Sequence, residues 1–447
     1  MSNTKKIFSK RCWLNGELQP ATIVINENKI SAIHLNKLAD AEDAGINIIM
    51  PGIIDAHVHV NEPGRTNWEG FETATKAAAA GGITTIVDMP LNANPVTTNV
   101  DAFNKKLFAA KDKLHVNVGF YGGLVPGNKQ DIEALIKAGV LGIKCFLTHS
   151  GIDEFPNVVE KEIEEAMPII AKYNFPLLAH CELSDAKIDK KFSDFPTSYR
   201  NYLESRPKKW ENDAVDLMIK LCRKQNCKTH IVHVSSAEAL SNIEKAKAEG
   251  YPLTAETCAH YIYFNAEEIP DSNCLYKCAP PIREKENNDL LKKALKSGVL
   301  DFITTDHSPA PPNIKELSTG NLLKAWGGIA GLQFLLPASW SALKEMITVE
   351  KFIPLLTEHP AKFLQVENQK GKLEVGYDAD IVIWNPDEIF EVKPKDILHR
   401  YNCSPYNGQQ LWGTVQQTIV NGTTVYQNKK IVEANKQCGQ LILHKQE

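Results

Sequence analysis

Short apolar runs rich in β-branched residues alternate with longer stretches of helical spacing through the middle of the chain. Apolar runs of about four to eight residues between turn signals are typical of strands buried in a parallel sheet. Eight runs fit this description and predict strands at residues 53–59, 83–88, 115–120, 142–147, 176–180, 230–234, 252–257 and 301–305. The segments between them predict helices that include residues 70–80, 131–138, 160–173, 212–224 and 237–248.

Strand–helix alternation repeated eight times predicts a parallel sheet that closes into a (β/α)8 barrel over residues 51–365. The rival architecture is a doubly wound open sheet. The sequence weakens this alternative because no turn of the GxGxxG type follows an early strand. The expected fold class is therefore α/β, with a TIM-like barrel as the catalytic part.

The two ends of the chain show a different pattern, in which short strand-like runs are separated by turns. Asn15-Gly16 and Glu27-Asn28 divide residues 7–50, and Asn421-Gly422 divides the strand-like run of residues 413–432. An Asn-Gly pair between two β-rich runs favours a two-residue hairpin turn. Residues 1–50 and 366–447 are therefore predicted to form one small β-sandwich domain together.

Composition restricts the function classes that remain. The chain has 447 residues, which suits one large domain and a smaller one, and its net charge is −4 with no basic excess for nucleic acid. It contains no run of about 18 apolar residues that would predict a membrane span. The start lacks the apolar stretch of a secretory signal, and the ten cysteines form no CxxC pair. Reduced thiols and a cytoplasmic location are expected.

Polar residues interrupt the apolar strands at their C-terminal ends. In a (β/α)8 barrel these ends surround one mouth, where the working residues lie. Residues two apart on a strand share a face, so both imidazoles of the pair in "DAHVHV" can reach one cation. The polar residues at the strand ends are His57, His59, Lys144, His180, His233 and Asp306. Each alone is more often structural, but their joint placement predicts a metal centre of the kind that suits Zn²⁺ better than Ca²⁺ or Mg²⁺.

Lys144 is the unusual member of this set, because it lies inside the apolar run "GIKCFL". A lysine in such a run can extend along the surface to reach water, but a central barrel strand offers poor access to solvent. A buried amine needs a partner or loses its charge.

At these residues the sequence resembles the amidohydrolase superfamily, and within it the cyclic-amidohydrolase branch of dihydroorotases, hydantoinases and allantoinases. The resemblance extends from "MPGIIDAHVH" to the run at residues 371–386. It implies two divalent metal ions, expected to be Zn²⁺, bridged by an N6-carboxylated Lys144. One ion would be held by His57, His59 and Asp306, and the other by His180 and His233. Asp306 would also be the catalytic group that accepts a proton from water and passes it to the leaving nitrogen.

Differences between the branches bear on the substrate. Dihydroorotases carry an arginine that grips a carboxylate where this chain has Asn61, and an amide cannot replace that cationic clamp. Hydantoinases and dihydropyrimidinases carry a tyrosine where this chain has His149. The runs "HVHVNEPGRTNWEGFETAT", "AETCAHY" and "CAPPIRE" resemble the allantoinase family. This resemblance implies hydrolysis of (S)-allantoin to allantoate in purine degradation, by a homotetramer.

Two alternatives to this interpretation remain open. The first is a hydantoinase, dihydropyrimidinase or dihydroorotase-like enzyme acting on another ring. The second, more remote, is a non-catalytic relative that keeps the barrel as an assembly module. Loss of metal ligands would mark such a module, and all six matched positions are present in this chain.

Asn61 and Asn92 are predicted substrate contacts. The role of Arg65 is open between a place in the pocket and an ion pair with Glu62 or Glu69. The sequence also leaves open the roles of His149 and His260, which are expected near the mouth. Trp68, Trp326 and His307 are interpreted as structural residues.

Overall fold

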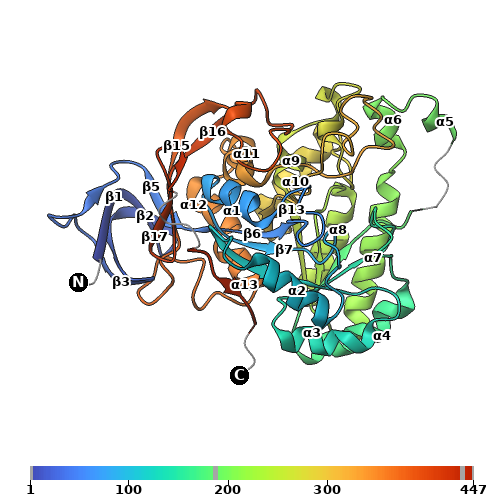
Figure 1. Cartoon of the computed structure of the whole chain (residues 1–447), viewed down its shortest axis with the longest axis horizontal. Helices are drawn as coiled ribbons and strands as arrows, with labels where there is room; N and C mark the ends of the chain where they lie inside the picture. The colour runs from blue at the N-terminus through green and yellow to red at the C-terminus, as the bar shows by residue number, and fades with distance from the viewer. Residues whose placement is uncertain (1–3, 185–189, 433–437, 445–447) are drawn as a thin grey trace.

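The structure is a computed structural model that describes residues 4–184, 190–432 and 438–444. Eight parallel strands of the described chain form the barrel, at the centre of Figure 1. They are β6 (Ile53–Val58), β7 (Ile83–Asp88), β8 (Asn117–Phe120), β10 (Ile143–Phe146), β11 (Leu177–His180), β12 (Thr229–Ile231), β13 (Leu253–Cys258) and β14 (Phe302–Thr304). The predicted barrel is confirmed.

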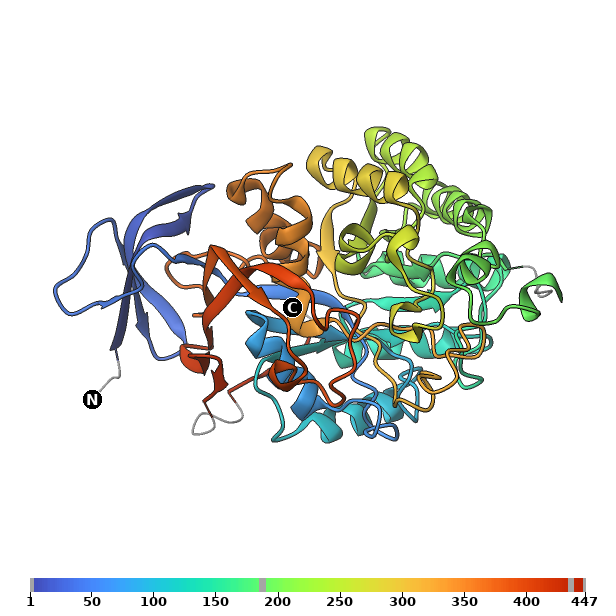
Figure 2. The same cartoon turned by 90° about the horizontal axis from the view of Figure 1, so that it is seen from above.

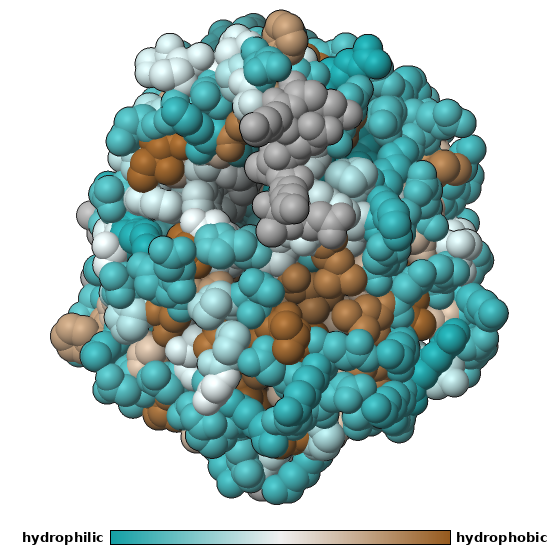
Figure 3. All heavy atoms as spheres, turned by 90° about the vertical axis from the view of Figure 1, so that its right-hand side faces the viewer, coloured by the Kyte–Doolittle hydropathy of each residue, from teal (hydrophilic) through white to brown (hydrophobic). Residues whose placement is uncertain are grey.

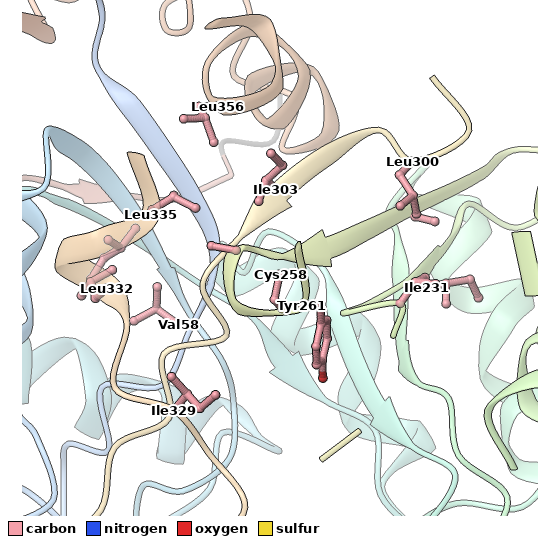
Figure 4. Close-up of a cluster of buried hydrophobic side chains, with 14 of the residues drawn as sticks. Val58, Ile231, Cys258, Tyr261, Leu300, Ile303, Ile329, Leu332, Leu335 and Leu356 are labelled. Atoms are coloured by element: carbon pink, nitrogen blue, oxygen red, sulfur yellow. The ribbon is translucent and has the colours of Figure 1, made fainter. Parts of the chain in front are cut away.

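Backbone contacts close the ring of strands at its two seams. The His59 amide donates to the His307 carbonyl at 2.8 Å, and Val58 forms a parallel bridge with His307. At the other seam the Leu141 amide donates to the Phe120 carbonyl at 2.8 Å, and the short strand β9 (Gly122–Gly123) pairs with β10. Side chains of the strands pack against side chains of the surrounding segments in one buried apolar cluster, as Figure 4 shows for Val58, Ile303 and Leu335.

Helices cover the outside of the barrel (Figures 1 and 2). The longer ones are α1 (Phe71–Ala80), α2 (Val100–Ala110), α3 (Ile132–Ala138), α4 (Glu160–Lys172), α7 (Lys208–Gln225), α8 (Leu240–Ala248), α10 (Lys285–Ser297) and α11 (Leu335–Leu343). The shorter ones are α5 (Lys190–Ser193), α6 (Tyr199–Glu204), α9 (Ala259–Tyr263), α12 (Val349–Phe352) and α13 (Glu358–Phe363). Single 3₁₀ turns are η1 (Lys129–Asp131), η2 (Ala237–Ala239), η3 (Ala266–Glu268), η4 (Cys274–Tyr276), η5 (Leu332–Phe334), η6 (Ile353–Leu356) and η7 (Pro394–Asp396). In α10, Leu291, Ala294 and Leu295 are buried, which is the spacing of one helix face.

Strands from both chain ends form one sheet beside the barrel, at the left of Figure 1. It contains β1 (Thr4–Leu14), β2 (Glu17–Asn26), β3 (Lys29–His34), β4 (Glu42–Asp43), β5 (Ile48–Pro51), β15 (Ile381–Glu391), β16 (Gln410–Val420), β17 (Thr423–Gln427) and β18 (Lys430–Ile431). Asn15-Gly16 joins β1 to β2 and Asn421-Gly422 joins β16 to β17, and all four residues have positive φ. The predicted small β domain built from both ends is present.

The C-terminal segment departs from the sheet of the chain ends. Strand β19 (Leu441–Ile442) pairs in parallel with β8 of the barrel instead. The Asn117 side chain of β8 holds this segment, because its Oδ1 accepts from the Gln440 amide at 3.0 Å. The domain limits 1–50, 51–365 and 366–447 stay a prediction. The hydrogen bonds of β19 connect the C-terminal segment to the barrel.

The structure also shows where the strands end more sharply than the sequence does. Two predicted strands, residues 230–234 and 301–305, end at Ile231 and Thr304. The physical reason lies just beyond: His233 has φ 39° and Asp306 has φ 43°, and no strand continues through the left-handed region.

The described part of the chain contains no helix that is both long and apolar enough to cross a membrane. The face seen in Figure 3 is largely hydrophilic, with separate apolar patches.

Candidate metal centre

Five of the six predicted metal ligands line one cavity of about 280 Å³ at the mouth of the barrel. These are His57, His59, His180, His233 and Asp306, and each is nearly or fully buried. The sixth, Lys144, lies in β10 and is also fully buried. Its Nζ is 5.0 Å from the centre of the Phe146 ring, which stacks on His180 at 4.4 Å. The structure therefore brings the predicted set together.

Asp306 is the carboxylate around which the histidines gather. Its Oδ1 lies 3.3 Å from His57 Nε2 and 3.2 Å from His59 Nε2. His57, His233 and Asp306 each offer a ligand atom within 4.8 Å of the others, and the His180 and His233 rings are 4.6 Å apart. This compact group takes residues from both expected ligand sets, so the two sets adjoin each other in one candidate metal site.

Four residues at the mouth have positive φ although none is glycine: Asn61 (67°), Asn92 (66°), His233 (39°) and Asp306 (43°). The left-handed conformation costs free energy for residues with a Cβ, less for asparagine and aspartate than for most. Non-glycine residues in this region cluster at functional sites, where surrounding contacts hold them. The backbone here turns His233 and Asp306 out of their strands and into the cavity.

Lys144 carries an amine for which the described residues supply no hydrogen-bond partner. Burial lowers its pKa to about 8, against the attraction of Asp306 and Glu256, which raises it. A buried amine without a partner is an unfavourable arrangement in a protein interior. Its position among imidazoles and a carboxylate fits a group whose chemistry is completed by a metal ion.

Burial also governs the imidazoles. It lowers the pKa of His59 to about 4 and that of His233 well below the usual value. Both rings are therefore neutral at physiological pH, and neutral imidazole is the form that binds metal.

Two carboxylates outside the predicted ligand set hold two of the histidines. The sequence had not identified these carboxylates as part of the site. Glu256 Oε1 lies 2.5 Å from His57 Nδ1, and Glu182 Oε2 lies 2.8 Å from His180 Nε2. Such partners fix the orientation of metal-binding imidazoles. Glu182 stands two residues after His180, and Glu256 lies in β13, which were the available sequence signals.

The two predicted substrate contacts are placed differently. Asn92 lines the cavity, and its Nδ2 is 3.2 Å from His59 Nδ1. Asn61 is buried but is not among the lining residues, and its Nδ2 donates to the Pro309 carbonyl at 3.3 Å.

The structure places the residues whose roles the sequence left open. Arg65 pairs with Glu154 at 2.7 Å, so the alternatives of Glu62 and Glu69 were wrong. His149 lines the cavity, with Nε2 3.2 Å from Asp153.

Two further histidines are buried beside the mouth. Burial lowers the pKa of His260 to about 4. His307 is structural as expected, since its Nδ1 accepts from the Gly331 and Leu332 amides and its Nε2 lies 3.3 Å from Glu69.

The cavity wall contains an aromatic ring and cations that sequence reasoning missed. Trp326, interpreted as a packing residue, lines the cavity together with Arg206 and Lys277. Lys277 Nζ donates to the Ala325 carbonyl at 2.5 Å, and burial lowers its pKa to about 7. The replacement of an arginine by Asn61 therefore does not leave the cavity without positive charge.

Comparison with known proteins agrees with this geometry. The profile of the amidohydrolase family matches residues 48–425. The chain is 42% identical to a probable allantoinase of Oryza sativa subsp. japonica, over 98% of this chain and 90% of the relative. It is 43% identical to an allantoinase of Arabidopsis thaliana (90% and 82%) and 39% identical to one of Saccharomyces cerevisiae (94% and 95%).

A solved structure of L-hydantoinase (dihydropyrimidinase) from Arthrobacter aurescens superposes with a TM-score of 0.91 at 29% identity, covering 99% of this chain and 100% of that one. A D-hydantoinase structure superposes with a TM-score of 0.90 at 24% identity, covering 99% of each chain. At that identity the superposition shows similarity of fold alone. The chain belongs to the amidohydrolase family, and within it to the group of the allantoinases.

Proposed function

We propose that the protein is a hydrolase that opens the ring of (S)-allantoin at its cyclic amide bond to give allantoate, within purine and ureide degradation. The similarity to proteins named allantoinase over nearly the whole chain supports this substrate. The structural observation that carries the proposal is the buried Lys144 amine, without a partner among the described residues, beside four imidazoles and a carboxylate.

The donor set fits two divalent metal ions, with zinc favoured by imidazole and carboxylate ligands. We assign His57, His59 and Asp306 to one ion and His180 and His233 to the other. Lys144, carboxylated at N6, would bridge them. Carboxylation would convert the stranded amine into an anion, and the two cations would pair with that anion and offset the cost of burying it. When bound, the ions would supply Lewis acidity and lower the pKa of a bound water toward neutrality.

Asp306 is the proposed catalytic residue of this chain. Its carboxylate accepts a proton from the attacking water as the water oxygen bonds to the carbonyl carbon of the ring. The C–N bond then breaks, and the same carboxyl group returns the proton to the leaving nitrogen. Asp306 Oδ1 is held close to His57 Nε2 and His59 Nε2, which restricts its orientation.

Further proposals concern the cavity, the assembly and the location. Asn92 and Asn61 remain proposed substrate contacts, with Asn92 the better placed because it lines the cavity. A homotetramer in the cytoplasm follows from the resemblance alone. Light scattering coupled to size-exclusion chromatography would measure the oligomeric state directly.

Substrate selection is tested by assaying protein prepared with zinc and bicarbonate. We expect turnover of allantoin with a kcat/KM well above that for hydantoin, dihydrouracil or dihydroorotate. The second candidate is a hydantoinase, favoured by the close superposition on a hydantoinase structure. Good turnover of hydantoin without turnover of allantoin would replace our proposal with that one. Absence of bound metal and of any turnover would favour the non-catalytic alternative.

A further inference from the structure

Arg206 lines the cavity and is connected through Glu182 to His180, one of the candidate metal ligands. It follows α6 in the chain, and its side chain lines the cavity with 24% of its surface exposed. Its Nε donates to Glu182 Oε1 at 3.0 Å and its Nη2 to Glu182 Oε2 at 2.5 Å. Two parallel hydrogen bonds of this kind fix the plane of a carboxylate as well as its distance.

Glu182 passes this orientation on to His180. The same Oε2 that accepts from Arg206 lies 2.8 Å from His180 Nε2, and the Glu182 side chain is only 1% exposed. The imidazole is also stacked on Phe146, with an angle of 12° between the rings. The ring of His180 is therefore held on its face by Phe146 and at its edge by Glu182.

The partner of each histidine determines which ring nitrogen remains for the centre. His57 gives Nδ1 to Glu256, which leaves Nε2 facing Asp306. His180 gives Nε2 to Glu182, which leaves Nδ1. A ring turned by 180° about its Cβ–Cγ bond would place a carbon where the ligand nitrogen was, so the carboxylate that fixes the ring orientation matters as much as the ligand distance.

We propose that Arg206 is a positioning residue, which fixes Glu182 and thereby holds His180 with Nδ1 directed to the metal centre. This inference rests on the proposed metal centre. A residue that only lined the cavity would not need to hold Glu182, so the inference gives Arg206 a second function. The guanidinium also borders the cavity, so a change at Arg206 alters both the cavity wall and the carboxylate that holds His180.

A second buried ion pair in the same part of the barrel provides a matched control. Arg283 Nη2 donates to Glu211 Oε2 at 3.2 Å, and both side chains are 2% exposed. Glu211 accepts from the Ser235 and Ser236 amides and contacts no candidate ligand in the described structure. Both are Arg–Glu pairs with a buried carboxylate, and Arg283 Nη1 also donates to the Arg206 carbonyl at 3.4 Å. Only the Glu182 pair contacts a predicted ligand.

The experiment measures the loss of zinc from purified enzyme to a chelator, together with zinc content and thermal unfolding. For Arg206→Gln and Glu182→Gln we expect zinc from one of the two positions to be lost about tenfold faster, or more. Arg206→Lys keeps the charge but not the two parallel bonds, and should lie between Arg206→Gln and the unaltered enzyme. Arg283→Gln should lower the unfolding temperature without changing zinc loss.

Addition of guanidinium chloride at low, non-denaturing concentration gives a second measurement. The cavity gives solvent access to the position of Arg206, so guanidinium should slow zinc loss from Arg206→Ala and should not do so for Glu182→Ala. A folded Arg206→Gln that retains zinc as the unaltered enzyme does would overturn the inference. Equal zinc loss in Arg283→Gln and Arg206→Gln would also overturn it, because the effect would then be structural. An unaltered enzyme that contains no zinc would instead contradict the proposed function.

Discussion

Two regions of the molecule contain buried lysines that differ in whether a carboxylate lies within ion-pair distance. At the junction between the barrel and the sheet of the chain ends, Lys370 Nζ lies 2.6 Å from Asp380 and 2.9 Å from Asp378. At the barrel mouth, Lys144, Lys277 and Lys315 have no carboxylate within ion-pair distance in the described chain.

The difference appears in the pKa values and in what each lysine does. Burial would lower the pKa of Lys370, but Asp380 and Asp378 raise it above the usual value. Burial lowers that of Lys315 to about 7, and its Nζ donates only to main-chain carbonyls, including Lys277 at 2.7 Å and Trp326 at 3.0 Å. Paired lysines stabilise the junction. Lys144, Lys277 and Lys315, whose pKa values burial lowers, lie beside the candidate site, and perturbed pKa values commonly gather at functional sites.

The largest expected effect comes from making the same substitution, aspartate to asparagine, in each of the two regions. Asp306→Asn should lower kcat by about 10³-fold, because the amide cannot accept the proton from water. Asp380→Asn should leave kcat nearly unchanged and lower the unfolding temperature, since it weakens the pair with Lys370. Steady-state kinetics and thermal unfolding of both variants check this. A comparable loss of kcat in both variants would contradict the proposed difference between the barrel mouth and the junction.

A change at the junction should act on stability alone. Lys370→Met leaves Asp378 and Asp380 without their buried partner, which should cost about 3 kcal/mol of unfolding free energy. Denaturant titration measures this cost, and allantoin turnover well below the unfolding temperature should match that of the unaltered enzyme. Unchanged stability would mean that the pair does not hold the junction.

The unpaired lysines at the mouth should give the protein a pH-dependent stability. Between about pH 7 and pH 10.5 the unfolded chain binds a proton at Lys315 that the native chain does not bind. The unfolding free energy should therefore rise with pH in this window and fall as the pH returns toward 7. Lys315→Met should reduce the slope by up to about 1.4 kcal/mol per pH unit. Lys370→Met should not reduce the slope, because its pKa is raised and not lowered.

The smallest effect concerns the turns of the chain-end sheet. Asn15 is exposed and has φ 52°, the left-handed conformation also adopted by Asp306 at the mouth. Asn15→Ala should cost about 1 kcal/mol of unfolding free energy without affecting turnover. Asn15→Gly should restore most of the loss, because glycine adopts positive φ freely. An alanine variant as stable as the parent would show that this hairpin tolerates strain.

The sequence predicted the parts of the structure that follow from local pattern. Apolar runs located all eight barrel strands, and Asn15-Gly16 and Asn421-Gly422 marked two hairpin turns. The six candidate ligands were found because parallel strand ends must meet at one mouth. Long-range contacts could not be predicted in the same way. Nothing local links Arg206 to Glu182, or places β19 beside β8.

Substrate contacts were the least predictable part of the site. Asn61 was chosen from its place in a motif, yet its Nδ2 donates to the Pro309 carbonyl and the residue is not among those that line the cavity. Trp326 and Lys277 line the cavity from a distant part of the sequence. Lys277 Nζ donates to the carbonyl of Ala325, the residue before Trp326. This tertiary contact brings the two residues together, and no local sequence pattern predicts it.

The central claim is that Lys144 completes a metal centre, and one measurement tests it most directly. Lys144→Ala, purified with zinc, should have no measurable allantoin turnover and should contain less zinc than the unaltered enzyme. Short carboxylic acids at high concentration should restore part of the turnover, because they supply the missing anion in the space left by the side chain. Full turnover and full zinc content without added acid would contradict the account.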